Sequence, residues 1–238
     1  MTSDSIEQAS LVDGAELHQT IARSWSSKYD KKSGFRNRLK VFRSILASMS
    51  IQGQLWLDAG CGSGVLTREL GALGASVVAL DASPEMIGFA REEAKASDGD
   101  IHYQVIRTIE YLPQFNSDFD GILCSSVLEY VSDPRLVILG FARVTRPGGY
   151  LLLTVPNTYS PIRIVQKIIR FMGGVIGFDF YRYLATSRNA YDVNSLRSLL
   201  ADAGFTVSHY QCIDPILNRV IGFSSLGSLL LVVAIKSR

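Results

Sequence analysis

The chain is poor in cysteine and histidine, with three of each among 238 residues. Cys61, Cys124 and Cys212 are odd in number and widely spaced. That pattern fits neither a disulfide framework nor a paired-cysteine metal site. We therefore expect a protein of the reducing cytosol, cytoplasmic in location, with no bound metal.

The chain also lacks a strong net charge and a long apolar run. Its formal charge is +2 with no run of five basic residues, so nucleic acid is not the expected partner. The N-terminus has neither the basic start nor the apolar stretch of a signal peptide. The most apolar segment, Leu226 to Ile235, is about half the ~20 residues that cross a bilayer, so we expect a buried strand there.

What the sequence does contain is an alternation of short apolar runs with helical patterns. Several runs are too continuously apolar for half-exposed strands, which favours a parallel sheet covered on both faces. We expect strands at residues 55–58, 76–80, 102–105, 121–124 and 150–155, and helices at 65–73, 84–96 and 134–144. Ser83 and Pro84 are typical of a helix start. This order predicts a doubly wound α/β fold.

After residue 157 the pattern changes to a helical stretch over 162–184, a helix over 193–203 and strands at 206–210 and 229–235. We expect one domain over 1–238, with a Rossmann-like, mostly parallel seven-stranded sheet and an antiparallel edge strand. Its parts are N-terminal cap helices (1–50), a cofactor-binding core (51–157), a helical lid insertion (158–190), and the last helix with two late strands (191–238).

A glycine-rich turn joins the first predicted strand to the first predicted helix. Gly60, Gly62 and Gly64 have no Cβ, so the chain can turn tightly and approach a ligand closely. Such turns lie at the carboxyl edge of doubly wound sheets, where ligands bind. Asp81 ends the second strand about 20 residues later, where a carboxylate can accept both hydroxyls of a ribose. A plain turn and a plain helix-start aspartate are the competing interpretations.

The turn disfavours a dinucleotide. The G-x-G-x-x-G fingerprint requires a small third residue, but Val65 stands there. Asp58 at the end of the first strand would repel a pyrophosphate and suits a cationic group. The ligand that combines ribose, adenine, positive charge and no phosphate is S-adenosylmethionine.

Four motifs occur in order: LDAGCGSG (57–64), VVALDASPEMIGFAR (77–91), FDGILCSSVLEYVSDP (119–134) and ARVTRPGGYLLLTVPN (142–157). With them the chain resembles the class I S-adenosylmethionine-dependent methyltransferases, and within them the small-molecule enzymes of ubiquinone and menaquinone biosynthesis. The resemblance covers 55–157 and resumes at 191–205. It implies that Asp58 and the glycine-rich turn hold the methionine portion, that Asp81 holds the ribose, that Ala82 and Met86 flank the adenine, and that Ser125 faces the reactive end. The full set of implied cofactor contacts is Asp58, Gly60, Cys61, Gly62, Gly64, Asp81, Ala82, Met86, Thr108, Ile109 and Ser125.

The chain departs from the family pattern at two places. Thr108 stands where relatives often carry an acidic residue that contacts adenine, so backbone groups are expected to recognise the base. Tyr130 replaces a histidine in the segment LEYV, which leaves the general base unassigned. Glu129 and Tyr130 are expected to line the acceptor pocket, although a helix-capping role for Glu129 is equally compatible with the sequence.

The insertion contains an amphipathic helix. Val165, Ile168, Ile169 and Met172 follow helical spacing on one face, while Arg163, Lys167 and Arg170 share the other. We expect a lid over an apolar acceptor, with Tyr159, Ile168, Ile169 and Met172 as substrate contacts. Ordinary core packing and a peripheral membrane contact are the alternatives.

The sequence thus predicts methyl transfer to a small, apolar organic acceptor, with oxygen as the first choice of acceptor atom. A sulfonium methyl group is already activated, so alignment of the acceptor and exclusion of water are the main tasks. Transfer to carbon or nitrogen, and a non-catalytic cofactor-binding subunit, are the alternatives. The acceptor and the oligomeric state are not predicted.

Overall fold

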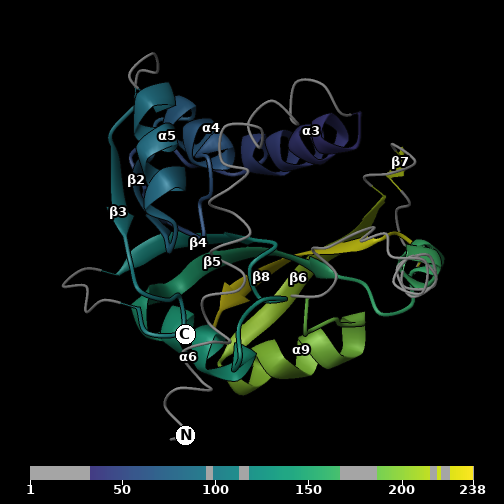
Figure 1. Cartoon of the computed structure of the whole chain (residues 1–238). Helices are drawn as coiled ribbons and strands as arrows, with labels where there is room; N and C mark the ends of the chain where they lie inside the picture. The colour runs from purple at the N-terminus through teal and green to yellow at the C-terminus, as the bar shows by residue number, and fades with distance from the viewer. Residues whose placement is uncertain are drawn as a thin grey trace, which may run out of the picture.

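A computed structural model of the chain describes residues 33–94, 99–112, 118–166, 187–214, 219–220 and 226–237. Its centre is an eight-stranded sheet in the order β3-β2-β1-β4-β5-β8-β6-β7, with helices on both faces (Figure 1). The strands are β1 (Leu55–Ala59), β2 (Ser76–Asp81), β3 (Ile101–Val105), β4 (Phe119–Ser125), β5 (Thr145–Pro156), β6 (Phe205–Asp214), β7 (Arg219–Val220) and β8 (Leu229–Lys236). The helices are α3 (Ser33–Ala47), α4 (Val65–Ala72), α5 (Pro84–Ala94), α6 (Pro134–Val144) and α9 (Val193–Asp202).

The first five strands are parallel, as the continuous apolar runs predicted. β1 pairs with β2 on one side and with β4 on the other, and β3 and β5 extend the sheet outward. Four of the five residues of β1 are buried, because helices cover both faces of this part of the sheet. The carboxyl ends of these strands therefore meet at one edge.

The antiparallel edge of the sheet is also confirmed. β8 pairs antiparallel with both β5 and β6, so the last strand in sequence is inserted between them. The predicted seven strands are present, and the two-residue β7 adds an eighth at the outer end. The fold is the Rossmann-like α/β architecture that the alternation of strands and helices indicated.

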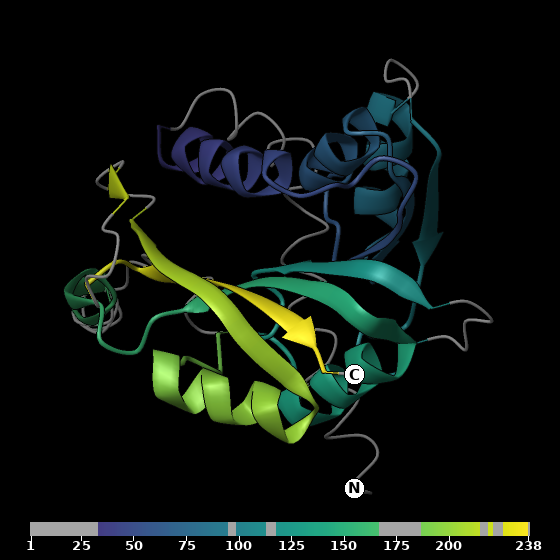
Figure 2. The same ribbon diagram turned by 180° about the vertical axis from the view of Figure 1, so that it is seen from behind.

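The helices form two layers. α3, α4 and α5 lie on one face, and α6 and α9 lie on the other (Figures 1 and 2). Trp56, Phe42 and Leu70 belong to the apolar cluster under α3 and α4, and Phe141 and Leu196 belong to the larger one under α6 and α9. Each cluster buries one face of the sheet and fixes the edge that carries the motifs.

Local sequence signals set several helix starts. Ser83 accepts a hydrogen bond of 3.2 Å from the Met86 amide, which confirms the predicted cap of α5. Asp192 and Ser195 form a capping box at α9. Residues 161–166 begin the predicted insertion helix, whereas 167–186 lie outside the described residues. Within the described ranges, no helix is long and apolar enough to cross a membrane.

Candidate functional site

The glycine-rich turn adopts the left-handed backbone that its glycines allow. Gly60, Gly62 and Gly64 have φ angles of 82°, 53° and 72°. The amides of Gly60 and Cys61 donate to the Leu80 carbonyl at 2.7 and 2.9 Å, which ties the turn to the end of β2. The turn is therefore fixed between the carboxyl ends of β1 and β2, where the sequence predicted it.

Asp81 joins this turn to the start of α5. Its Oδ2 accepts from the Gly62 amide at 2.8 Å, and its Oδ1 accepts from the Ser83 amide at 2.9 Å. Burial raises the pKa of the Asp81 carboxyl, and these backbone donors partly offset that effect. Each oxygen keeps acceptor capacity, since a carboxylate can accept about four hydrogen bonds.

Asp58 is a second buried carboxyl beside the turn. It is 2% exposed, and its Oδ2 accepts from the Thr67 hydroxyl at 2.6 Å. Its pKa is raised to about 7, because burial and the neighbouring charge of Asp81 raise it more than the Thr67 hydrogen bond lowers it. Two acidic side chains thus meet at adjacent strand ends, which favours a cationic ligand group.

The space around the turn differs from one glycine to the next. A Cβ at Gly60 would collide with the Val127 side chain, and one at Gly64 would lie 2.7 Å from the Tyr103 hydroxyl. At Gly62 a Cβ would meet nothing within 4 Å. The turn therefore packs tightly at Gly60 and Gly64, whereas the space over Gly62, next to the Asp81 carboxylate, is open.

The residues predicted to contact the adenine differ in burial. Ala82 is half-buried and Met86 is 2% exposed at the start of α5, beside Asp81. Thr108 is half-buried, and Ile109 packs into the large apolar cluster. Whether Thr108 and Ile109 contact a ligand stays a prediction.

Glu110 is an acidic residue that follows β3, and its carboxylate binds backbone amides of the loop after β4. The Glu110 carboxylate is buried and accepts from the amides of Ser132 and Asp133 at 2.5 and 2.9 Å. It therefore supports the loop between β4 and α6. Among the described residues, no cluster of His, Cys, Asp and Glu could hold a metal ion.

Arg38 is a further buried side chain at the carboxyl edge, and none of the sequence motifs included it. Arg38 of α3 is 7% exposed and donates hydrogen bonds to the Ser125 hydroxyl at the end of β4 and to the Thr154 hydroxyl of β5, the latter at 3.3 Å. Its Nε has no hydrogen-bond partner among the described residues. The available signal was its spacing: Arg38 is a cation four residues before the buried Phe42, on the apolar stripe of its helix.

Glu129 lies near this arginine, in the loop after β4. Its side chain is 4% exposed, and Oε2 has no hydrogen-bond partner in the described part of the chain. Burial raises the pKa of Glu129 to about 7, against the charges of Arg163 and Arg38, which lower it. Burial also raises the pKa of Tyr191 to about 12, and Glu129 contributes to that rise. The buried Glu129 carboxyl therefore interacts electrostatically with Arg38, Arg163 and Tyr191.

The two ends of the insertion lie side by side, and the returning end contacts this loop. Residues Asn157 and Tyr191 form a β-bridge, so the chain leaves and re-enters the core at one place. The Arg188 amide donates to the Glu129 carbonyl at 2.7 Å, and the Asn189 amide group donates to the carbonyls of Leu128 and Val131 at 2.9 and 2.8 Å. The returning chain thus holds the Glu129 loop in place.

The structure brings the first two predicted motifs together at one edge, with Ser125 and Glu129 at the end of β4 alongside. Tyr130 is half-buried in the same loop, whereas Tyr159 is 62% exposed. Ile168, Ile169 and Met172 lie outside the described residues, as do Lys167 and Arg170. Val165, from the same predicted apolar face, is 53% exposed.

Comparison with known proteins gives a consistent family. Residues 57–153 match the methyltransferase domain. The chain is 34% identical over 113 residues to a ubiquinone biosynthesis O-methyltransferase of Xanthomonas oryzae pv. oryzae, covering 48% of this chain and 47% of the relative. The protein of the same description from Xanthomonas axonopodis pv. citri is 34% identical over 160 residues, covering 66% and 67%. The first relatives are thus matched over about half their length.

Solved structures agree at the level of the fold. The magnesium protoporphyrin IX methyltransferase of Synechocystis, solved with bound SAH, superposes with a TM-score of 0.64 at 20% identity and covers 86% of each chain. This likeness extends beyond the matched domain to the late helix and strands.

Proposed function

The chain belongs to the S-adenosylmethionine-dependent methyltransferases, and from this premise we propose that it transfers the methyl group of S-adenosylmethionine to an oxygen of a small, apolar organic molecule. The observation that carries the proposal is the open space over Gly62, which lies beside the Asp81 carboxylate, with the buried Asp58 carboxyl at the adjacent strand end. Relatives named O-methyltransferases support the choice of oxygen.

The residues at the strand ends fit this cofactor. Asp81 keeps free acceptor positions for the two ribose hydroxyls while it binds the Gly62 and Ser83 amides. Asp58 offers negative charge to the cationic methionine portion, whose presence would favour the ionised carboxylate. Ala82 and Met86 would flank the adenine. When bound, the cofactor supplies an activated methyl group on a sulfonium.

Arg38 and Ser125 are proposed to hold the methionine end. The Arg38 guanidinium is buried at the end of β4 with an unused Nε donor, and a carboxylate is the anion that a guanidinium binds best. Ser125 is the last residue of β4 and accepts a hydrogen bond from Arg38, so it stays a proposed cofactor contact. Both residues would orient the cofactor for in-line transfer.

Glu129 is proposed as the proton acceptor that the sequence left unassigned. Its buried carboxyl has a pKa of about 7 and a free Oε2, and a base is most effective when its pKa is close to the working pH. An acceptor hydroxyl that hydrogen-bonds to Oε2 would lose its proton to Glu129 as the oxygen gains the methyl group. Tyr130 in the same loop is proposed to contact the acceptor.

The insertion is proposed to cover the acceptor. Its two ends are joined by the bridge between Asn157 and Tyr191, and its returning end holds the Glu129 loop. Ile164 and Val165 at its beginning are each 53% exposed, so they are available to an apolar ligand or to a membrane surface. Tyr159, Ile168, Ile169 and Met172 stay proposed substrate contacts.

The proposal is tested by incubating the protein with methyl-labelled S-adenosylmethionine and a panel of phenols and aromatic acids. Release of S-adenosylhomocysteine together with a labelled methyl ether or ester supports it. A labelled methyl group on carbon or nitrogen would show that the acceptor atom is not oxygen. Cofactor binding without turnover across the panel and a cell extract would favour a non-catalytic subunit. Glu129→Gln should strongly reduce turnover, whereas Glu93→Gln, a matched change at an exposed acid, should not.

A further inference from the structure

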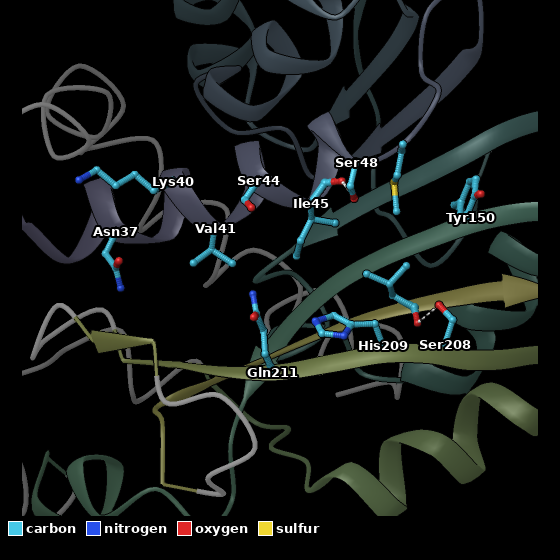
Figure 3. A pocket seen from close by; sticks show the side chains of 12 residues that line it. Asn37, Lys40, Val41, Ser44, Ile45, Ser48, Tyr150, Ser208, His209 and Gln211 are labelled. Carbon is cyan, nitrogen blue, oxygen red and sulfur yellow. Dashed lines mark hydrogen bonds between the residues drawn. The ribbon is translucent and has the colours of Figure 1, made fainter.

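A second cavity lies on the same face of the sheet as α3, apart from the motif residues. It has a volume of about 710 Å³ and lies between Asn37–Met49 on one side and β6, with contributions from β5 and β8, on the other (Figure 3). We call it the α3 groove. It shares no residue with the proposed cofactor and acceptor sites, and its size is that of small-molecule pockets.

The groove has apolar walls that a ligand body could contact. Val41 and Ile45 are one helical turn apart on α3, Met49 follows the end of the helix, and Tyr150 and Val233 line the groove from the sheet. Figure 3 shows Val41 and Ile45 pointing down from α3 into the space above β6. Such a strip suits an aromatic ring or an alkyl chain.

Lys40 is the only formally charged side chain among the described residues that line the groove. Lys40 and His209 are its ionisable bases, and among the described residues that line it none is acidic. The helix that carries Lys40 has four basic residues and no acidic residue. The groove therefore offers a positive potential to a ligand and favours an anion.

A buried donor points to the same conclusion. The Nδ2 of Asn37 is buried and has no hydrogen-bond partner among the described residues. In Figure 3 the Asn37 amide points down from α3 toward the strand side of the groove. Lys40 lies at the same end and extends outward along α3, and Gln211 points up from the strand side beneath Val41. Buried donors normally have acceptors, so a ligand oxygen here would complete an otherwise unsatisfied group.

From these features we propose that the α3 groove binds a small apolar carboxylate. The carboxylate accepts hydrogen bonds from Asn37 and Lys40 at one end, and the apolar body lies along Val41 and Ile45. This binding is separate from methyl transfer and does not depend on it.

The test is calorimetric titration of the full chain with 2-naphthoate, and with 2-naphthamide as the uncharged analogue of the same shape. We expect one naphthoate per chain, with affinity reduced at least about tenfold for the amide and for Lys40→Glu, because both remove a charge-assisted contact. Arg36→Glu is the matched control: it makes the same charge change at an exposed position of α3 outside the lining, and affinity should stay within about twofold.

Saturating S-adenosylmethionine should leave naphthoate binding unchanged, since the sites share no residue. The proposal is overturned if naphthoate does not bind, if Arg36→Glu weakens it as much as Lys40→Glu, or if the cofactor displaces it. It is also overturned if sedimentation shows a dimer that Lys40→Glu dissociates, because the occupant is then a second copy. A separate titration with cofactor alone shows whether the proposed function holds, whatever naphthoate does.

Discussion

The carboxylate of Asp81 accepts a hydrogen bond of 2.8 Å from the backbone amide of Gly62, the residue at the centre of the glycine-rich turn. The same carboxylate accepts from the Ser83 amide at the start of α5. Asp81 thus fixes the turn, and in the proposed function it also offers acceptors to a ribose, so changes at Asp81 and Gly62 test different parts of the proposal.

Asp81→Ala should cost about 2 to 4 kcal/mol of S-adenosylmethionine affinity, because hydrogen bonds to charged groups contribute roughly 1.5 to 3 kcal/mol each and do not add fully. Calorimetric titration measures the loss, and circular dichroism checks the fold. Asp81→Asn keeps one acceptor oxygen and should lose less. Equal affinities of Asp81→Ala and wild type would remove Asp81 from the cofactor site.

Gly62→Val should abolish cofactor binding while the protein stays folded. The valine side chain would occupy the open space over Gly62, where a Cβ has no neighbour within 4 Å. The φ of 53° adds strain of about 1 to 2 kcal/mol. Gly53→Val is the matched control, since Gly53 also has a positive φ and an open Cβ position but lies before β1, away from the motifs. Cofactor binding should persist in that variant. If both variants bind, the ligand lies elsewhere.

Glu129→Gln should reduce kcat by about 10²- to 10⁴-fold, the usual contribution of general base catalysis. In the wild type the rate should rise with pH up to a plateau above about 7, because only the ionised carboxylate accepts a proton and burial raises the Glu129 pKa to about 7. Stopped-assay kinetics between pH 5 and 9 measure both effects. A pH profile that keeps its rise in Glu129→Gln would assign the titration to another group.

Asp58→Asn should change how stability depends on pH. The folded pKa of Asp58 is about 7, against an ordinary value of 3.8, so between these values the folded protein holds a proton that the unfolded chain releases. The stability from this group is full below pH 3.8 and is lost as the pH rises to about 7. The total is on the order of 4 kcal/mol, at roughly 1.4 kcal/mol per pH unit. Urea unfolding at pH 4 and pH 7.5 should show a smaller decline in the variant than in the wild type.

Ile164→Ser combined with Val165→Ser tests the start of the insertion. Both side chains are 53% exposed, so the free energy of unfolding should change by no more than about 0.5 kcal/mol per site. The acceptor KM should rise if these residues cover the acceptor, with cofactor affinity unchanged. Leu139→Ser on α6, at 44% exposure, is the control and should leave KM unchanged. Reduced sedimentation with anionic vesicles at a normal KM would instead indicate a membrane contact.

Short-range patterns in the sequence determined much of this protein. The order of apolar runs predicted the parallel strands, because a strand buried on both faces must be apolar at nearly every position. The glycines at 60, 62 and 64 predicted the turn, since left-handed φ angles strongly favour glycine. Ser83 predicted the start of α5 because an N-cap depends on residues within one helical turn. Each of these signals depends only on residues close together in the chain, so it can be recognised from the sequence alone.

The tertiary structure alone decided which distant side chains meet. Arg38 and Ser125 are 87 positions apart, and no spacing rule connects them. Glu110 was available as an adenine contact by its place after β3, yet its carboxylate binds the amides of Ser132 and Asp133. The raised pKa of Glu129 follows from burial, and burial depends on helices and loops that pack around it from elsewhere in the chain. The sequence therefore determined the glycine-rich turn and the strand ends beside it through local backbone chemistry. The contacts of Arg38, Glu110 and Glu129 and the α3 groove arise from long-range packing, which a local residue pattern does not encode.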